Sequence, residues 1–426
     1  MSGGAIYHLD PRVGGLAPSA TLAINERSAE LTRQGQCVYR FGLGQSPFPV
    51  PPQMVRALAE AAAEKDYLPV RGLFSLRETI AAWHQRTYGQ AFGAHDILVG
   101  PGSKELIFLL QLAYDAELLL PSPSWVSYGP QAQILGRPVQ WLSTRVEDGL
   151  RLRPEVLDAA CAGARRPRLL ILNYPNNPTG ATYDADALAE LAAVARTHGV
   201  LVLSDEIYGE LNHQGAHASI ANAYPEGTII SSGLSKWCGA GGWRLGYFAV
   251  PGALGWLADA MAAIASETFT SVSAPIQYAA IRAFEPSAEI ETYVHKSRAI
   301  LRALGGHIAH TLTAAGARLP SPEGGFYLFP DLSGHRAALA ARGISTSVEL
   351  CEALLTATGV AVLPGVCFGR DPSELSLRLS YVNFDGPGAL DAVSLGAPPD
   401  GAFLMRHCGE AVEAADRMAA FVTGGA

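Results

Sequence analysis

The sequence is poor in lysine and has no run of basic residues. Only four of its 31 basic residues are lysines, and the formal net charge is −8. Nucleic-acid binding depends on lysine and arginine side chains that neutralise successive phosphates. The lack of a basic run, together with the negative charge, argues against a nucleic-acid partner.

Closely spaced cysteines and long apolar runs are also missing. The six cysteines form no CxxC pair, and no histidine spacing matches a zinc site, so we expect free thiols and no metal. No run of eighteen apolar residues occurs, and the first residues lack the basic and then apolar pattern of a secretion signal. The sequence therefore predicts a cytoplasmic protein without a membrane-spanning segment.

Apolar residues are plentiful enough for more than one core. They make up 49% of the 426 residues, and this length exceeds that of one ordinary domain. We predict an N-terminal arm at 1–28, a large domain at 53–305, and a small domain formed by 29–52 together with 306–426.

Short apolar runs alternate with helical patterns, which is typical of a parallel sheet covered by helices. Strands are expected at 97–99, 118–120, 168–173, 200–204, 228–231 and 247–250. A helix at 184–199 joins the third strand to the fourth. We therefore predict an α/β fold: a large domain with a mostly parallel sheet flanked by helices, plus a smaller α+β domain. Ligands bind at the carboxyl ends of such strands, where Gly100, Asn173, Asp205 and Ser232 fall.

Lys236 lies in the stretch Ser-Lys-Trp-Cys-Gly-Ala-Gly-Gly-Trp-Arg, which ends at Arg244. Its amine can form a Schiff base, and the arginine can bind a phosphate. Together they suggest pyridoxal 5′-phosphate. Lys65 and Lys296 lie in charged helical runs, and Lys104 opens a helix, so they suit this chemistry less well. An ordinary surface lysine is the alternative for Lys236.

Two further segments carry polar residues at strand ends. Asn177 lies in Asn-Tyr-Pro-Asn-Asn-Pro-Thr-Gly, where prolines and glycine fix a turn and leave its amide free to point into a cleft. Asp205 ends an apolar strand, and a buried acid needs a partner such as a protonated pyridine nitrogen. Tyr208, three residues on, is placed to reach the ring hydroxyl. The alternatives are an ordinary turn for Asn177 and a helix cap for Asp205.

Two more segments offer sites for anions. Gly-Pro-Gly-Ser-Lys at 100–104 joins a strand to a helix, whose free backbone donors can bind a phosphate, although Gly-Pro-Gly is also a common turn. Arg378 interrupts the apolar strand expected at 375–381. It is either paired structurally or presents its two-pronged guanidinium to a carboxylate.

In their order along the chain, Asn-Asn-Pro-Thr-Gly, Ser-Asp-Glu-Ile-Tyr, Ser-Lys with Gly-Trp-Arg-Leu-Gly, and Arg-Leu-Ser-Tyr resemble the class I/II aminotransferases of the fold-type I pyridoxal-phosphate enzymes. The resemblance spans about residues 40–385. It implies that Lys236 holds the cofactor as an imine and then moves the proton at the substrate Cα. It also implies that Asp205 keeps the pyridine nitrogen protonated and that Asn177 and Tyr208 hydrogen-bond the ring hydroxyl.

The resemblance assigns the other site residues as well. Trp125 matches the aromatic residue that stacks on the ring, although a core tryptophan is the alternative. The residues implied in holding the phosphate are Gly102, Ser103, Lys104 and Arg244, and Ser235 is also expected to bind the cofactor. Arg378, with Gly44 and Asn177 beside it, would bind the substrate. Tyr67 matches a tyrosine that reaches the phosphate of a neighbouring subunit, which implies a homodimer with sites at the interface.

Two features depart from the family pattern. Gly233 stands where the family usually has a serine that bonds the phosphate, so either Ser232 or Ser235 substitutes, or the phosphate is held with one hydroxyl fewer. Residues 386–407 form an insertion without an assigned role.

The implied function is the transfer of an amino group between an L-amino acid and a 2-oxo acid. The same residues also support a lyase, synthase or oxidase acting on an amino acid, because the bond broken at Cα depends on how the pocket orients the substrate. A cofactor-binding regulator without catalysis is the alternative from another class. No second arginine in a recognisable position indicates a dicarboxylate substrate.

Overall fold

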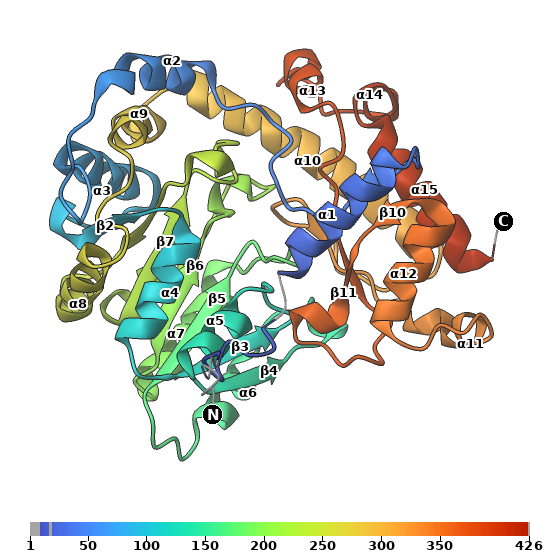
Figure 1. Cartoon of the computed structure of the whole chain (residues 1–426), viewed down its shortest axis with the longest axis horizontal. Coiled ribbons are helices and arrows are strands. Elements are labelled where there is room, and N and C mark those ends of the chain that lie inside the picture. The colour runs from blue at the N-terminus through green and yellow to red at the C-terminus, as the bar shows by residue number, and fades with distance from the viewer. Residues whose placement is uncertain (1–8, 17–18, 425–426) are drawn as a thin grey trace, which may run out of the picture.

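The computed structural model describes residues 9–16 and 19–424, which contain one seven-stranded sheet and two small sheets (Figure 1). The large sheet has the order β2-β8-β7-β6-β5-β3-β4. Its strands are β2 (Ile97–Gly100), β3 (Glu117–Ser122), β4 (Val139–Ser143), β5 (Arg168–Asn173), β6 (Leu201–Asp205), β7 (Thr228–Gly233) and β8 (Gly246–Ala249). All neighbouring strands from β4 to β7 are parallel, and β8 is antiparallel to β7 and β2. The predicted α/β class is confirmed.

The central strands are those that the sequence predicts best. β6 and β7 are buried at every position, because helices cover both faces of the sheet, and such strands show continuous apolar runs. β4 was not predicted. It lies at the edge of the sheet, and Leu142 is its one buried residue, so it has no apolar run.

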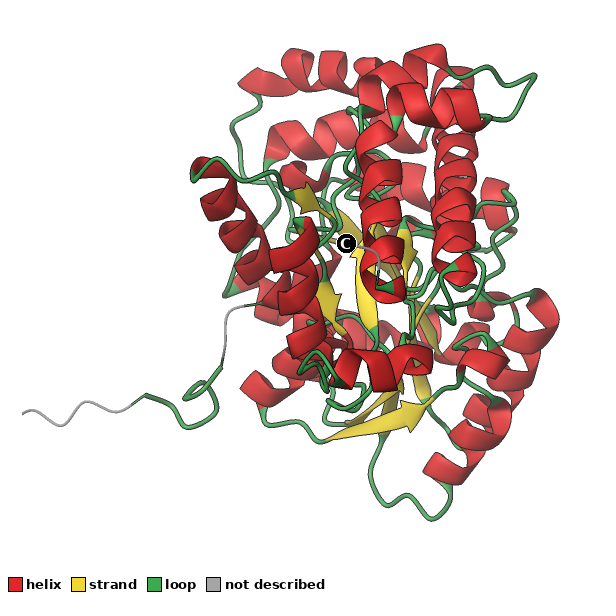
Figure 2. Cartoon of the chain, turned by 90° about the vertical axis from the view of Figure 1, so that its right-hand side faces the viewer, coloured by secondary structure: helices red, strands yellow, loops and turns green. Residues whose placement is uncertain are grey.

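The described residues form fifteen α-helices, and several of them pack on both faces of the large sheet, as the turned view also shows (Figure 2). The helices are α1 (Ala20–Arg33), α2 (Pro52–Glu60), α3 (Phe74–Tyr88), α4 (Ser103–Ala113), α5 (Tyr128–Leu135), α6 (Pro154–Cys161), α7 (Ala185–Thr197), α8 (Gly255–Ser266), α9 (Ala274–Phe284), α10 (Ala288–Ala314), α11 (Arg336–Ala340), α12 (Ser347–Thr358), α13 (Gly386–Ala392), α14 (Gly401–His407) and α15 (Gly409–Thr423). Successive strand side chains point to opposite faces. Leu118 and Leu120 therefore pack with α4, α5 and α8, whereas Leu119 packs with α6 and α7. Within the described residues, no helix has the length and apolar character needed to cross a membrane.

Two smaller sheets form from the C-terminal part of the chain together with β1 near its start. β11 (Leu363–Pro364), β12 (Leu377–Ser380) and β9 (Tyr327–Leu328) form an antiparallel sheet, and β1 (Tyr39–Arg40) pairs with β10 (Val360–Ala361). Figure 1 shows α10 running from the side of the large sheet towards these elements. The helix continues through residue 305, where we place the boundary between domains; that division stays a prediction.

Two segments are more regular than the sequence indicated. Helix α1 begins within the proposed arm at 1–28, and its Ala20 and Ile24 pack against a small core that includes Phe329 and Phe368. Residues 1–8 and 17–18 of the arm lie outside the described residues. The insertion at 386–407, for which the sequence predicts no helix, contains α13 and α14.

A buried histidine makes the stability depend on pH. The imidazole of His84 bonds Gln90 Oε1 at 2.7 Å and Tyr247 Oη at 3.0 Å, and burial lowers its pKa from 6.5 to about 4. Between pH 6.5 and 4, His84 therefore stays neutral in the folded state, whereas the same residue binds a proton in the unfolded state. We expect the free energy of unfolding to fall by about 3 kcal/mol from this residue as the pH is lowered from 6.5 to 4.

Urea denaturation at pH 7 and pH 5, at one protein concentration, tests this prediction. The variant His84→Gln lacks the titrating group, so its stability should fall less between the two pH values than that of the wild type. Equal losses in both proteins would contradict the role of His84.

Candidate active site

A cavity of about 390 Å³ opens at the carboxyl ends of the strands of the large sheet. Ser103 follows β2, Trp125 follows β3, Asn173 ends β5, Asp205 ends β6 and Lys236 follows β7; all five line the cavity. Parallel strands bring their carboxyl ends to one edge. Arg244 reaches the same edge from the start of β8, because that strand runs in the opposite direction.

Lys236 is the amine best suited to covalent chemistry in this cavity. It donates a hydrogen bond of 2.7 Å to Gly44 O and lies 5.8 Å from the centre of the Tyr208 ring. Removal from water lowers its pKa to about 8, and the charges of Arg378 and Arg244 act in the same direction. The neutral, nucleophilic form of the amine is therefore accessible near neutral pH.

Asp205 has one carboxylate oxygen without a partner. Oδ2 accepts a hydrogen bond of 2.6 Å from Tyr128 Oη, whereas Oδ1 has no hydrogen-bond partner within the described part of the chain. The residue is 3% exposed, and burial raises its pKa to about 6. An unbonded oxygen in such a place costs free energy, so the site is built to receive a hydrogen-bond donor.

Arg378 is a buried guanidinium without an acidic partner. It is 1% exposed, donates to Asn177 Oδ1 at 3.3 Å and to Gly42 O, and leaves Nε unbonded. No carboxylate among residues 9–16 and 19–424 forms an ion pair with it. The rings of Tyr327 and Phe368 lie 5.0 and 5.3 Å from its Cζ. Of the two alternatives for Arg378, a carboxylate site fits this geometry better than a structural ion pair.

Asn177 is held with its side chain at this site. Its backbone N–H donates to Asn173 Oδ1 at 2.7 Å, which anchors the turn after β5. Its Oδ1 accepts from Arg378, and its Nδ2 has no hydrogen-bond partner among the described residues. Within this part of the chain, both N–H donors of Nδ2 are therefore free, and the residue lines the cavity. Its contact with a ligand hydroxyl stays a prediction.

Tyr208 lies beside the cavity with its hydroxyl already bonded. Its Oη is 2.8 Å from Tyr327 Oη, and burial raises its pKa well above the ordinary value. A Cβ at position 44 would overlap Tyr327 Oη, which explains why glycine stands there. The sequence did not indicate Tyr327 or Tyr128 as site residues, although Tyr128 lies only three residues after Trp125.

The other end of the cavity offers donors to an anion. Helix α4 starts at Ser103 without a side-chain cap, so backbone N–H groups are free. Gly102 has φ +91°, and a Cβ there would overlap the guanidinium of Arg244, which forms no ion pair in the described part of the chain. Lys104 Nζ lies 5.3 Å from the centre of the Trp125 ring, and burial and the charge of Arg244 lower its pKa.

The structure explains why position 233 holds glycine and not the usual serine. Its partner across β7 and β8 is Gly246, and a Cβ at 233 would lie 2.7 Å from Leu245 O and 2.8 Å from the Gly246 Cα. A serine does not fit at this position without a backbone shift. Ser235 lines the cavity instead, whereas Ser232 does not.

Tyr67 is not part of this cavity within one chain. Its side chain is 92% exposed. Its role at a neighbouring subunit, and with it the homodimer, stays a prediction.

The charges of the site are unbalanced. Four cations, Lys104, Lys236, Arg244 and Arg378, face or adjoin the cavity, and Asp205 is its one acidic lining residue among those that the structure describes. In a chain with a net charge of −8, such a concentration of positive charge favours a ligand with several negative charges. A phosphate and a carboxylate together satisfy this requirement.

The fold, and a cavity that holds an amine among several cations, point to an enzyme that acts on small anions, and comparison with known proteins identifies its family. The family model described as aminotransferase class I and II matches residues 37–385, and the chain belongs to this family. It is an aminotransferase, which moves an amino group between an amino acid and a 2-oxo acid. The predicted family and reaction are confirmed.

Relatives and solved structures agree. The chain is 35% identical over 382 residues to an aspartate aminotransferase of Geobacillus stearothermophilus, covering 88% of this chain and 94% of the relative. It is 33% identical to an aspartate/prephenate aminotransferase of Thermus thermophilus, with the same coverage. The structure of Thermus thermophilus aspartate aminotransferase with maleate matches with a TM-score of 0.82 and 32% identity, covering 91% of this chain and 98% of that one.

Proposed function

We propose that this chain is a pyridoxal 5′-phosphate-dependent aminotransferase whose amino donor is an acidic amino acid, aspartate in the first place. The observation that carries the proposal is the unbonded Asp205 Oδ1, buried in the same cavity as the amine of Lys236. A protonated pyridine nitrogen is the donor that suits such a carboxylate, because each charge favours the ionised form of the other.

The other residues also fit this cofactor. Its phosphate would be held by the free N–H groups at the start of α4, by Ser235 and by Arg244. Trp125 would lie against the ring, and Asn177 Nδ2 would bond the ring hydroxyl. When bound, pyridoxal phosphate supplies an aldehyde that accepts an amine and a ring that takes up negative charge from Cα.

The protein's own groups then have distinct tasks. Arg378 would bind the α-carboxylate of the amino acid and, being buried, would take it out of water. Lys236, whose pKa lies near 8, is suited to remove and return the proton at Cα. Asp205, oriented by Tyr128, would keep a positive charge on the ring nitrogen.

The acidic substrate is supported by the relatives' names and by Lys104. Aspartate has two carboxylates, and Arg378 can take only one of them. The side chain of Lys104 lines the same cavity and forms no ion pair within the described residues. Since the backbone of this residue can serve the phosphate at the start of α4, its ammonium group is free for the second carboxylate.

We also propose that the protein acts as a homodimer. The almost complete exposure of Tyr67 supports this, because a large aromatic side chain at the surface is suited to enter a neighbouring subunit.

The substrate proposal is tested by kinetics with a panel of amino donors. The protein is supplied with pyridoxal phosphate and 2-oxoglutarate, and formation of each new oxo acid is measured for L-aspartate, L-alanine and L-phenylalanine. We expect kcat/KM for L-aspartate to exceed that for L-alanine at least ~10-fold, since a charge-assisted hydrogen bond contributes about 1.5–3 kcal/mol. Equal values would refute an acidic substrate without touching the aminotransferase assignment.

The variant Lys104→Met shows whether this residue carries the preference. It should raise KM for L-aspartate about tenfold and leave that for L-alanine nearly unchanged, with Lys65→Met, an exposed lysine, as the control. If KM rises equally for both substrates and the affinity for the cofactor falls, Lys104 binds the phosphate instead.

A further inference from the structure

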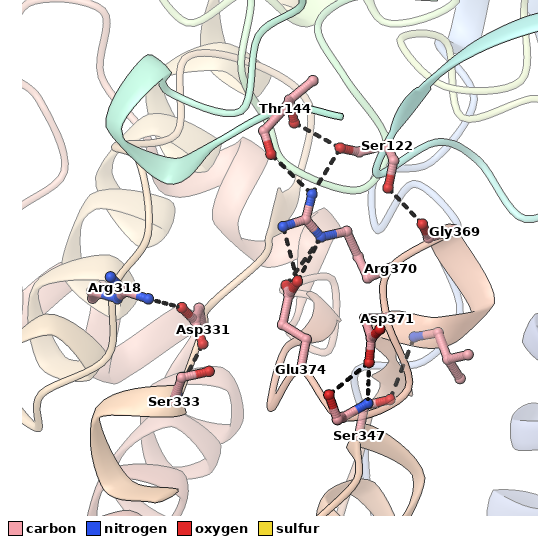
Figure 3. Close-up of polar contacts among 12 residues, drawn as sticks. Ser122, Thr144, Arg318, Asp331, Ser333, Ser347, Gly369, Arg370, Asp371 and Glu374 are labelled. Atoms are coloured by element: carbon pink, nitrogen blue, oxygen red, sulfur yellow. Dashed lines mark hydrogen bonds and ion pairs between the residues drawn. The ribbon is translucent and has the colours of Figure 1, made fainter. Parts of the chain in front are cut away.

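Arg370 connects the three-stranded sheet to the large sheet, and it does not line the cavity. We call residues 365–374, between β11 and β12, the strap. From the strap, Arg370 Nη1 donates 3.0 Å hydrogen bonds to Ser122 O, at the end of β3, and to Thr144 O, just after β4 (Figure 3). The strap therefore crosses from the three-stranded sheet to the carboxyl edge of the large one.

Glu374 holds the guanidinium in this orientation. It accepts from Arg370 Nε at 2.9 Å and pairs with Nη2 at 2.9 Å, and the two side chains are 15% and 21% exposed. With Nε and Nη2 occupied, Nη1 is left to point at the two carbonyls, as Figure 3 shows. A planar guanidinium can bond these three partners, Glu374, Ser122 and Thr144, at the same time. A lysine ammonium on a flexible stem does not reproduce this geometry.

The strap has two more bonds to the same edge. Ser122 Oγ donates to Gly369 O at 2.7 Å, and Ser124 N donates to Phe368 O at 3.0 Å. Gly369 has φ +83°, and Trp141 of β4 occupies the space that a Cβ would take. The contact therefore requires glycine at 369, because a side chain there has neither the space nor a favourable backbone conformation.

The residues on both sides of this contact are neighbours of proposed site residues. The ring of Phe368 lies 5.3 Å from the Arg378 guanidinium, on the side of the three-stranded sheet. On the other side, Ser124 immediately precedes Trp125, and Tyr128 of the same segment bonds Asp205. The strap is therefore a short bonded path between the proposed carboxylate site and the proposed cofactor site.

We propose that Arg370 is a positioning residue for amino transfer: by clamping the strap to the ends of β3 and β4, it sets where Arg378 presents the substrate carboxylate relative to Trp125 and Asp205. The inference rests on the proposed roles of those residues. Arg370 itself touches neither substrate nor cofactor.

The test compares Arg370→Met with Arg417→Met in the cofactor-loaded enzyme. Arg417 and Glu413 on α15 form an ion pair with the same i,i+4 spacing as Arg370 and Glu374. Arg417 lies against Tyr39 of β1, its hydrogen bonds within the described residues go to Glu413, and neither residue lines the cavity. We expect Arg370→Met to raise both KM for L-aspartate and the Kd for maleate, a non-reacting dicarboxylate, at least ~10-fold, with the bound-cofactor spectrum retained. Arg417→Met should leave the KM for L-aspartate, the Kd for maleate and the bound-cofactor spectrum unchanged.

A milder variant guards against misfolding. Ser122→Ala removes only the bond to Gly369 O and should raise the Kd for maleate about fivefold in the same assay. Wild-type KM and Kd in Arg370→Met would overturn the inference, as would equal losses in Arg370→Met and Arg417→Met. Failure of the wild type to bind maleate or to transaminate would instead refute the proposed function.

Discussion

Lys236→Ala is expected to lower kcat for amino transfer by about 10⁴-fold or more. The change removes both the amine that would bond the cofactor and the base at Cα, and positioned acid–base groups alone contribute about 10²–10⁴-fold. The burial that lowers the pKa of Lys236 to about 8 is what suits it to both tasks. Single-turnover measurements with L-aspartate and cofactor-loaded enzyme separate this step from product release.

Two controls accompany this variant. Lys65→Ala alters an exposed lysine that does not line the cavity of its own chain and should retain wild-type kcat. Lys104→Ala removes the other lysine of the cavity and should retain the covalent attachment of the cofactor. If Lys236→Ala kept a tenth of the wild-type kcat, or if Lys104→Ala abolished the attachment, the assignment of the amine would be wrong.

Asp205→Asn is expected to lower kcat by about 10²–10³-fold with little change in KM. The amide has the shape of the carboxylate and can still accept the hydrogen bond from Tyr128, but it brings no negative charge to the ring nitrogen. A preorganised electrostatic contact in a buried site is worth roughly this factor. The pH dependence of the bound-cofactor absorbance gives a second readout, because the charge on the ring would be lost in the variant.

Glu206→Gln is a matched control for Asp205→Asn. Glu206 is the next residue and is equally buried, but its carboxylate bonds Ser204, Ser219 and His217 and does not line the cavity. We expect this variant to lose stability while keeping kcat within about threefold. Equal losses of kcat in both variants would mean that the strand end, and not the charge of Asp205, governs the rate.

The sequence was most informative where local pattern and burial coincide. The strands β2, β3, β5, β6, β7 and β8 were predicted because strands covered on both faces show continuous apolar runs. Edge strand β4 and helices α13 and α14 were missed, because each buries only part of its surface and its pattern is correspondingly weak. Of the residues predicted at strand ends, Asn173 and Asp205 line one cavity together with Lys236 and Asn177, since the parallel topology brings these ends together, whereas Gly100 and Ser232 do not line it.

By itself, then, the sequence determined the α/β class, the family and the residue types available for chemistry, because these follow from short-range patterns and ordered motifs. Only the tertiary structure decided whether Arg378 has an acidic partner and which oxygen of Asp205 is free. It alone also joined Arg370 to Ser122, 248 positions away in the chain. The reason is physical: a hydrogen bond is made or left unmade by neighbours that come from distant segments, and no local pattern records which groups those segments bring.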